Sequence, residues 1–249
     1  MEQRQAAITH PIPEIPRGGR RLVIPDIHGC AATFEALLDQ IGLTYEDQLF
    51  LLGDYINKGP NSRGVVDTIL RLRDQSFAVF ALRGNHEQML LDLHDQARYG
   101  KARLNIPRLH RYHGLVNRNM RILPHYVAFF EQLPFYFDLG DFMLVHAGFD
   151  FARPRPFQNT KAMLWASYFD LSDAPDLDRR IVHGHNPNYL PFIQDALAQQ
   201  SAIIPLDNGC VYRNKHHMGN LLCLNLDTME LFLQKNAEPR GRKKTRATR

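Results

Sequence analysis

The chain has 249 residues, of which 44% are hydrophobic and 22% charged, with a formal net charge of +4. That composition is typical of a globular protein and excludes disordered, fibrous and membrane-embedded classes, and a chain of ~250 residues buries a sizeable core unaided. No apolar run approaches the ~20 residues of a membrane-spanning helix and no secretion signal opens the chain, so we expect a cytoplasmic protein without a membrane partner. Three cysteines without CxxC spacing argue against a disulfide framework or a zinc ribbon.

Between residues 20 and 96 one pattern occurs three times: an apolar strand, a polar turn, and a helix with apolar side chains at helical spacing. Before it, residues 1–19 hold three prolines and little periodicity, which predicts an extended N-terminal arm. The strands are expected at 20–25, 48–53 and 76–82, and the helices at 31–41, 63–73 and 88–96.

After Gly100 the periodicity weakens, and a helical stretch interrupted by Pro and His predicts a cap inserted over the sheet edge at about 96–133. Segments rich in strand signals follow, beginning with a hairpin that turns at 139–141. Further strands are expected within 179–187, 202–212 and 220–234.

Together these elements predict an α/β fold in which two packed mixed β-sheets are flanked by helices. No internal repeat of fixed period divides the chain. We expect a single domain over 20–236, with the cap as an insertion, and a basic C-terminal tail over 237–249.

Basic side chains are concentrated in two acid-free segments. Residues 240–249 carry six of them, which is typical of a solvated chain end. The segment 96–130 carries seven and lies beside the polar clusters described next, so it is either a surface for nucleic acid or a solvated face of the cap.

Polar clusters follow the apolar strands, in short turns that contain glycine. Because open α/β sheets bind ligands at the carboxyl ends of their strands, these clusters indicate a functional site. Their carboxylate, amide and imidazole groups, without thiolate, suit manganese, iron or zinc, and they exceed the four ligands of one structural zinc, so two metals sharing a ligand are expected. The clusters are Asp26 with His28, Gly53 with Asp54, Asn85 with His86, His146, and His183 with His185.

The segments DIHG, GDYINKGP, RGNHE, HAG and HGH, in that order between about Leu22 and Tyr212, resemble the motif series of the phosphoprotein phosphatase family of calcineurin-like binuclear metallophosphoesterases. RGNHEQM is similar to the phage lambda type of Ser/Thr phosphatase. GDYINKGPNS is also similar to the second motif of the symmetrical diadenosine tetraphosphate hydrolases, which share the scaffold.

The resemblance implies two divalent ions, with manganese preferred and iron, zinc, nickel or cobalt as alternatives. They would generate a hydroxide that attacks phosphorus in line. His86 would be the general acid, and Arg83 would contact the phosphate. His183 has no counterpart among the family's ligands, so a structural role is expected. The implied ligands are Asp26, His28 and Asp54 for the first ion, and Asp54 as the bridge, Asn85, His146 and His185 for the second.

The sequence departs from the family pattern at three phosphate-binding positions. Asn57 and Lys58 stand where the second motif has aspartate and arginine, and Ser167 stands where an arginine follows the family's tryptophan segment. An amide orients the ring of His86 but does not neutralise its charge, and Lys58 keeps a charge without the planar fork of arginine.

Four functions remain open on this basis. The overall motif match favours a phosphomonoesterase resembling the protein Ser/Thr phosphatases, acting on a phosphopeptide, a nucleotide or a small molecule. The thinned cationic clamp and the aromatic residues of the segment 96–130 favour a phosphodiesterase or nuclease instead. The second motif favours a dinucleoside polyphosphate hydrolase. A non-catalytic binding module is the fourth, opposed by the complete set of implied ligands.

Overall fold

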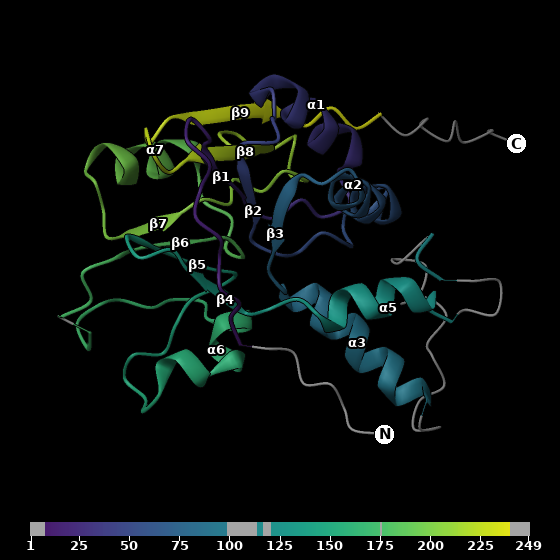
Figure 1. Cartoon of the computed structure of the whole chain (residues 1–249), viewed down its shortest axis with the longest axis horizontal. Coiled ribbons are helices and arrows are strands. Elements are labelled where there is room, and N and C mark those ends of the chain that lie inside the picture. The colour runs from purple at the N-terminus through teal and green to yellow at the C-terminus, as the bar shows by residue number, and fades with distance from the viewer. Residues whose placement is uncertain (1–7, 99–113, 117–120, 175, 240–249) are drawn as a thin grey trace, which may run out of the picture.

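Two β-sheets lie face to face in the computed structural model, which describes residues 8–98, 114–116, 121–174 and 176–239 (Figure 1). One has the strand order β3-β2-β1-β8-β9 and the other β4-β5-β6-β7. The first comprises β1 Arg21–Ile24, β2 Gln48–Leu51, β3 Ala78–Ala81, β8 Asn220–Asn225 and β9 Leu231–Lys235. The second comprises β4 Tyr136–Asp138, β5 Phe142–Val145, β6 Arg180–His183 and β7 Ile203–Pro205.

The first three strands are parallel and their side chains alternate between two cores. Leu22 and Ile24 of β1 lie in the core beneath the helices, whereas Val23 between them faces the second sheet. This two-residue period is what a strand imposes when both of its faces are covered. The space between the sheets is filled by Phe50, Leu52, Leu144, Val182 and Leu222, among others.

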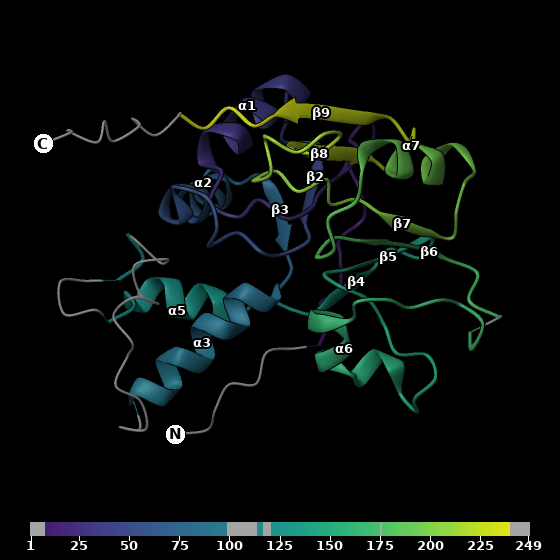
Figure 2. The same cartoon turned by 180° about the vertical axis from the view of Figure 1, so that it is seen from behind.

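Helices cover the outer faces of both sheets (Figures 1 and 2). Over the first sheet lie α1 Ala31–Ile41 and α2 Ser62–Asp74, and the N-terminus of α2 is capped by Asn61, whose side chain accepts a hydrogen bond from the Gly64 amide at 2.9 Å. Over the second sheet lies α6 Thr160–Trp165, after the short 3-10 turn η2 Pro156–Gln158. The helix α7 Leu190–Ala198 packs beside β7.

The helix α3 extends from Asn85 to Arg98, and its first residue lies three positions before the predicted start. Asn85 and His86 therefore belong to the first turn of a helix and not to a free turn. In the predicted cap, α5 Pro124–Glu131 packs side by side with α3 in both views (Figures 1 and 2). Most of the cap's basic side chains lie outside the described residues.

The predicted fold class is confirmed: two mixed sheets flanked by helices. The hairpin at 139–141 joins antiparallel β4 and β5, and β8 and β9 form the closing hairpin. The boundaries of the arm, the domain and the tail stay predictions. Among the described residues, no helix is both long enough and apolar enough to cross a membrane.

Candidate metal centre

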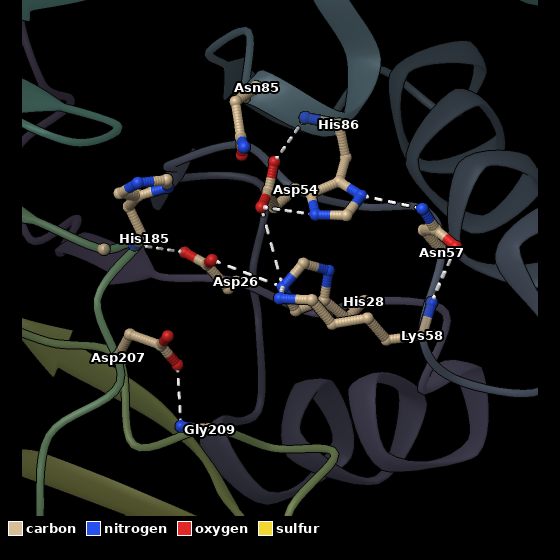
Figure 3. Close-up of polar contacts among 12 residues, drawn as sticks. Asp26, His28, Asp54, Asn57, Lys58, Asn85, His86, His185, Asp207 and Gly209 are labelled. Carbon is tan, nitrogen blue, oxygen red and sulfur yellow. Dashed lines mark hydrogen bonds and ion pairs between the residues drawn. The ribbon is translucent and has the colours of Figure 1, made fainter. Parts of the chain in front are cut away.

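The loops that follow the strands bring the predicted site residues together where the two sheets meet (Figure 3). The loop after β1 carries Asp26 and His28, the loop after β2 carries Asp54, and α3 presents Asn85 and His86 directly after β3. From the second sheet, His146 follows β5 and His185 follows β6. These strands are parallel within each sheet, so their carboxyl ends lie at one edge.

The backbone of these loops is unusual. His28, Asp54 and His185 have positive φ angles of 50°, 53° and 68°, a region that costs free energy for residues other than glycine. Gly53 has φ +104°, and a Cβ there would lie 2.6 Å from the amide nitrogen of Gly84, so the second and third loops approach each other as only glycine allows.

The side chain of Glu87 joins the loop after β2 to the loop after β3. Its buried carboxylate accepts hydrogen bonds from the backbone amides of Asp54, Tyr55 and Gly84 at 2.8, 2.9 and 3.0 Å. Burial raises the pKa of Glu87 to about 7, against the lowering effect of those amides. No role was predicted for this residue, although it belongs to the RGNHE segment.

In the first group of ligands, Nε2 of His28 lies 3.6 Å from Oδ2 of Asp26 and 3.5 Å from Oδ2 of Asp54. Nδ1 of His28 lies 3.2 Å from the carbonyl of Ile56, which only accepts, so Nδ1 donates, and the lone pair on Nε2 faces the space between the two carboxylates, where the ammonium of Lys58 lies 2.6 Å away. Burial lowers the pKa of His28 well below its ordinary value. The ring is therefore neutral, which is the form in which histidine binds a metal.

The second group is centred on His146, which is fully buried. Its Nε2 lies 3.2 Å from Oδ1 of Asn85, 3.2 Å from Nδ1 of His185 and 3.6 Å from Oδ1 of Asp54. Its Nδ1 donates to the carbonyl of Leu52 at 3.0 Å, and burial lowers its pKa well below the ordinary value. The ring of His146 is thus also neutral and held in one orientation, as its predicted role as a metal ligand requires.

Asp54 lies between the two groups and presents one oxygen to each. Within the described residues, its ligand atoms and those of His28 and His86 lie within 4.8 Å of one another, and the same holds for Asp54, His146 and His185. Burial raises the pKa of Asp54 well above its ordinary value, so its charged form calls for a compensating cation. This arrangement of carboxylate and neutral imidazole groups fits two divalent ions that share Asp54.

Asp207 is a fourth carboxyl group at this site, for which no role was predicted (Figure 3). One of its oxygens accepts a hydrogen bond from the Gly209 amide at 2.7 Å, while Oδ2 is buried without a hydrogen-bond partner among the described residues. Oδ2 of Asp26 is likewise buried and has no hydrogen-bond partner among the described residues. The signal was present, because Asp207 follows β7 at the same sheet edge as the other clusters.

Two of the residues predicted to bind phosphate also contact the histidines of the site. Asn57 Nδ2 lies 2.8 Å from Nδ1 of His86, and the ammonium of Lys58 lies 2.6 Å from Nε2 of His28. Both residues have positive φ angles, 74° and 62°. The backbone amide of His86 donates a hydrogen bond to Oδ1 of Asp54 at 3.0 Å, which fixes the position of His86 further.

The guanidinium of Arg83 is turned to other partners. It donates to Oε1 of Gln88 at 2.9 Å and to the carbonyl of Glu131 at 2.8 Å, and it lies over the ring of Phe135 at 4.9 Å. Arg83 is only 7% exposed, so its predicted contact with phosphate stays a prediction. His183 is buried against Phe169, consistent with a structural role.

The model of the calcineurin-like phosphoesterases matches residues 19–228, and the chain belongs to this family of metal-dependent hydrolases of phosphate esters. An asymmetrical bis(5'-nucleosyl)-tetraphosphatase PrpE from Anoxybacillus flavithermus is 27% identical over 84% of this chain and 91% of the relative. A symmetrical bis(5'-nucleosyl)-tetraphosphatase from Wigglesworthia glossinidia brevipalpis is 40% identical, but the match covers 29% of this chain and 26% of that relative.

Solved structures show the same fold. A putative diadenosine tetraphosphatase superposes with a TM-score of 0.61 at 24% identity, covering 92% of this chain and 97% of that one. A Saccharomyces cerevisiae Ser/Thr phosphatase superposes with a TM-score of 0.60 at 15% identity, covering 89% and 81% of the two chains. The family and the enzyme class predicted from the sequence are confirmed, and the individual roles of the site residues stay predictions.

Proposed function

We propose that this protein hydrolyses the phosphoanhydride bonds of dinucleoside polyphosphates. The observation that carries the proposal is the contact of Asn57 Nδ2 with Nδ1 of His86 at 2.8 Å. An amide donor at Nδ1 favours the neutral ring with its single proton on Nε2, and it supplies no counter-charge for a doubly protonated ring. Such an acid suits a substrate whose leaving group is already a stable anion, as a nucleotide released from an anhydride is.

Most of the site residues would be ligands of two divalent ions. Asp26, His28 and Asp54 would hold one divalent ion, and Asp54, Asn85, His146 and His185 the other. When bound, two such ions polarise a phosphate and lower the pKa of a water. The carboxylate and imidazole composition leads us to propose manganese, with iron, zinc, nickel or cobalt as alternatives.

The remaining side chains act on the substrate. Nε2 of His86 lies 3.8 Å from Oδ2 of Asp54, the carboxylate that would bridge the two ions. From this place Nε2 would pass its proton to the departing oxygen of the substrate. The ammonium of Lys58 would offset phosphate charge as a point cation. The names of the two nucleosyl tetraphosphatase relatives support this choice of substrate.

A phosphomonoesterase of the Ser/Thr type remains the second candidate, because the motifs and the fold are shared. An alkyl phosphomonoester carries more charge on the attacked phosphate and has a poorer leaving group, and both demand more from Lys58 and His86 than this site supplies. The nuclease alternative depends on the segment 96–130, most of whose basic side chains lie outside the described residues, and it stays a prediction.

Steady-state kinetics test the proposal. With manganese present, we expect kcat/KM for bis(5'-adenosyl) tetraphosphate to exceed that for glycerol phosphate by at least 100-fold. Bis-nitrophenyl phosphate tests the diester alternative in the same assay. Equal or better turnover of glycerol phosphate would replace the proposal with a phosphomonoesterase.

A further inference from the structure

A cavity of about 390 Å³ opens beside the metal centre, between α6 and the segments that flank it on the outer side of the second sheet. Its wall includes Trp165, whose ring meets that of His185 edge to face with centroids 6.3 Å apart. The side chain of Asn186, next to His185, donates to the carbonyls of Ala166 and Ser167 at 3.2 and 3.0 Å. The cavity wall and a ligand of the second ion are therefore connected directly.

The cavity presents aromatic side chains that the fold does not bury. Trp165 is 42% exposed and Tyr168 is 80% exposed, whereas Phe149 behind them is buried in the core of α6 and the second sheet. The hydroxyl of Tyr168 donates to Oδ2 of Asp170 at 3.3 Å, and Asp170 is held in turn by Ser172. Exposed ring faces at a hollow next to a reaction centre are suited to stacking on a planar ring.

The charges around the cavity exclude the phosphate chain from it. Three carboxylates, Asp150, Asp170 and Asp173, line the cavity together with the ammonium of Lys161, and Asp150 is also paired with the guanidinium of Arg153 at 3.7 Å, which leaves Asp170 and Asp173 as the excess of negative charge. This balance repels polyphosphate, while carboxylates accept hydrogen bonds from the N–H groups of a nucleobase. A volume of about 390 Å³ lies within the ~300–1,000 Å³ of small-molecule sites.

We propose that this cavity is the subsite for one purine base of the substrate, which stacks on Trp165 and Tyr168 while the phosphates lie at the metal centre. The inference rests on the proposed function, since it names the part of a dinucleoside polyphosphate that binds outside the metal centre. The subsite favours nucleotides over phosphate esters that lack a planar group.

Trp165 makes the subsite directly observable, because it is the single tryptophan of the chain. Titration of adenosine into the manganese-loaded protein should quench its fluorescence in a saturable way, and titration of ribose should not. Adenosine carries no phosphate, so this binding is independent of whether the tetraphosphate is hydrolysed. Absence of saturable quenching by adenosine would overturn the subsite.

Two variants locate the effect. Tyr168→Ala removes an exposed ring and spares the core, so we expect at least a five-fold weaker affinity for adenosine and a similar rise in KM for bis(5'-adenosyl) tetraphosphate. The kinetics of glycerol phosphate, which has no planar ring to stack, should be unchanged. Tyr189→Ala removes a comparably exposed tyrosine, 62% exposed, that does not line the cavity, and it should change none of these values.

The two proposals fail separately. Hydrolysis of the tetraphosphate with an unchanged KM in Tyr168→Ala would overturn the base subsite and keep the proposed function. Saturable quenching by adenosine without hydrolysis of the tetraphosphate would keep the subsite and overturn the proposed function. Quenching by an arginine-rich peptide in place of adenosine would assign the cavity to a basic peptide and overturn the subsite.

Discussion

Asn57 donates a hydrogen bond from its side-chain nitrogen to Nδ1 of His86 over 2.8 Å. The direction of this bond follows from a second contact, because the amide of Lys58 donates to Oδ1 of Asn57 at 3.1 Å and an N–H requires an acceptor. Nδ2 is thereby turned toward His86, whose Nδ1 must accept. The single ring proton then sits on Nε2, the nitrogen that faces Asp54 (Figure 3).

This contact predicts the effect of Asn57→Asp. A carboxylate would pair with the protonated ring and make His86 a better acid, so we expect about a 10-fold gain in kcat/KM for glycerol phosphate and little gain for nitrophenyl phosphate, whose leaving group needs no proton. Asn61→Asp is the matched control, because it adds the same charge at the helix cap, where aspartate serves as well. An equal gain on both esters would show that the charge acts on binding.

The shared position of Asp54 predicts that Asp54→Asn is the most damaging ligand change. Losing the carboxylate disturbs both groups of ligands, so we expect the bound manganese to fall below one ion per chain and turnover to fall at least 1,000-fold. Elemental analysis and steady-state kinetics measure the two. Asp39→Asn, an exposed change on α1, is the control. Two retained ions with ordinary turnover would rule out the bridging role.

Asp207→Asn should change metal affinity and stability in opposite directions. Burial raises the pKa of Asp207 to about 6, so its charge at pH 7 costs stability in the absence of metal, and the amide should raise the melting temperature of the chelated protein. The same change removes a negative charge that helps to attract the first ion, so we expect about 10-fold weaker manganese binding. Calorimetric titration and thermal unfolding measure both. Lower stability together with unchanged affinity would contradict this role.

The ion pair of Arg20 and Asp47, remote from the centre, predicts an acid-dependent part of the stability. Asp47 accepts from Arg20 at 2.6 Å and from Thr44, and these contacts hold its pKa at about 2 against the opposing effect of burial. Because the pKa of Asp47 is lower in the folded state than in the unfolded state, the ion pair stabilises the folded protein above pH ~4. This contribution to the free energy of unfolding, about 1 to 2 kcal/mol, is lost as the pH falls toward 2.

Asp47→Asn tests this sign. Urea unfolding at pH 7, 4 and 2.5 should show the variant less stable at pH 7 and the difference closing at pH 2.5. The exposed change Asp39→Asn serves again as the control. A difference that is the same at all three pH values would mean that Asp47 stabilises the fold through packing and not through its charge.

The local pattern of the chain was sufficient for the elements and for the family. Short apolar runs followed by polar turns predicted β1, β2 and β3 to within two residues, and the helix over 31–41 was predicted at its observed bounds, because Phe34, Leu37 and Ile41 must share one buried face. The order of the polar clusters predicted the phosphoesterase family, and their place after the strands predicted that they would meet. Such inferences succeed because periodicity and turn chemistry are local properties.

Contacts between segments distant in the sequence were decided only by the tertiary structure. The position of Asp207 after β7 is a local signal for a site residue, but its place beside Asp26, 181 positions earlier in the chain, depends on how the two sheets pack. Tertiary packing also decides the partner of Arg83, whose guanidinium donates a hydrogen bond to the carbonyl of Glu131. The aromatic cavity at Trp165 likewise forms only where the segment after β5 and the segment after α6 meet around that helix. Long-range packing sets these neighbours, since a side chain's partners are chosen by where the elements come to rest.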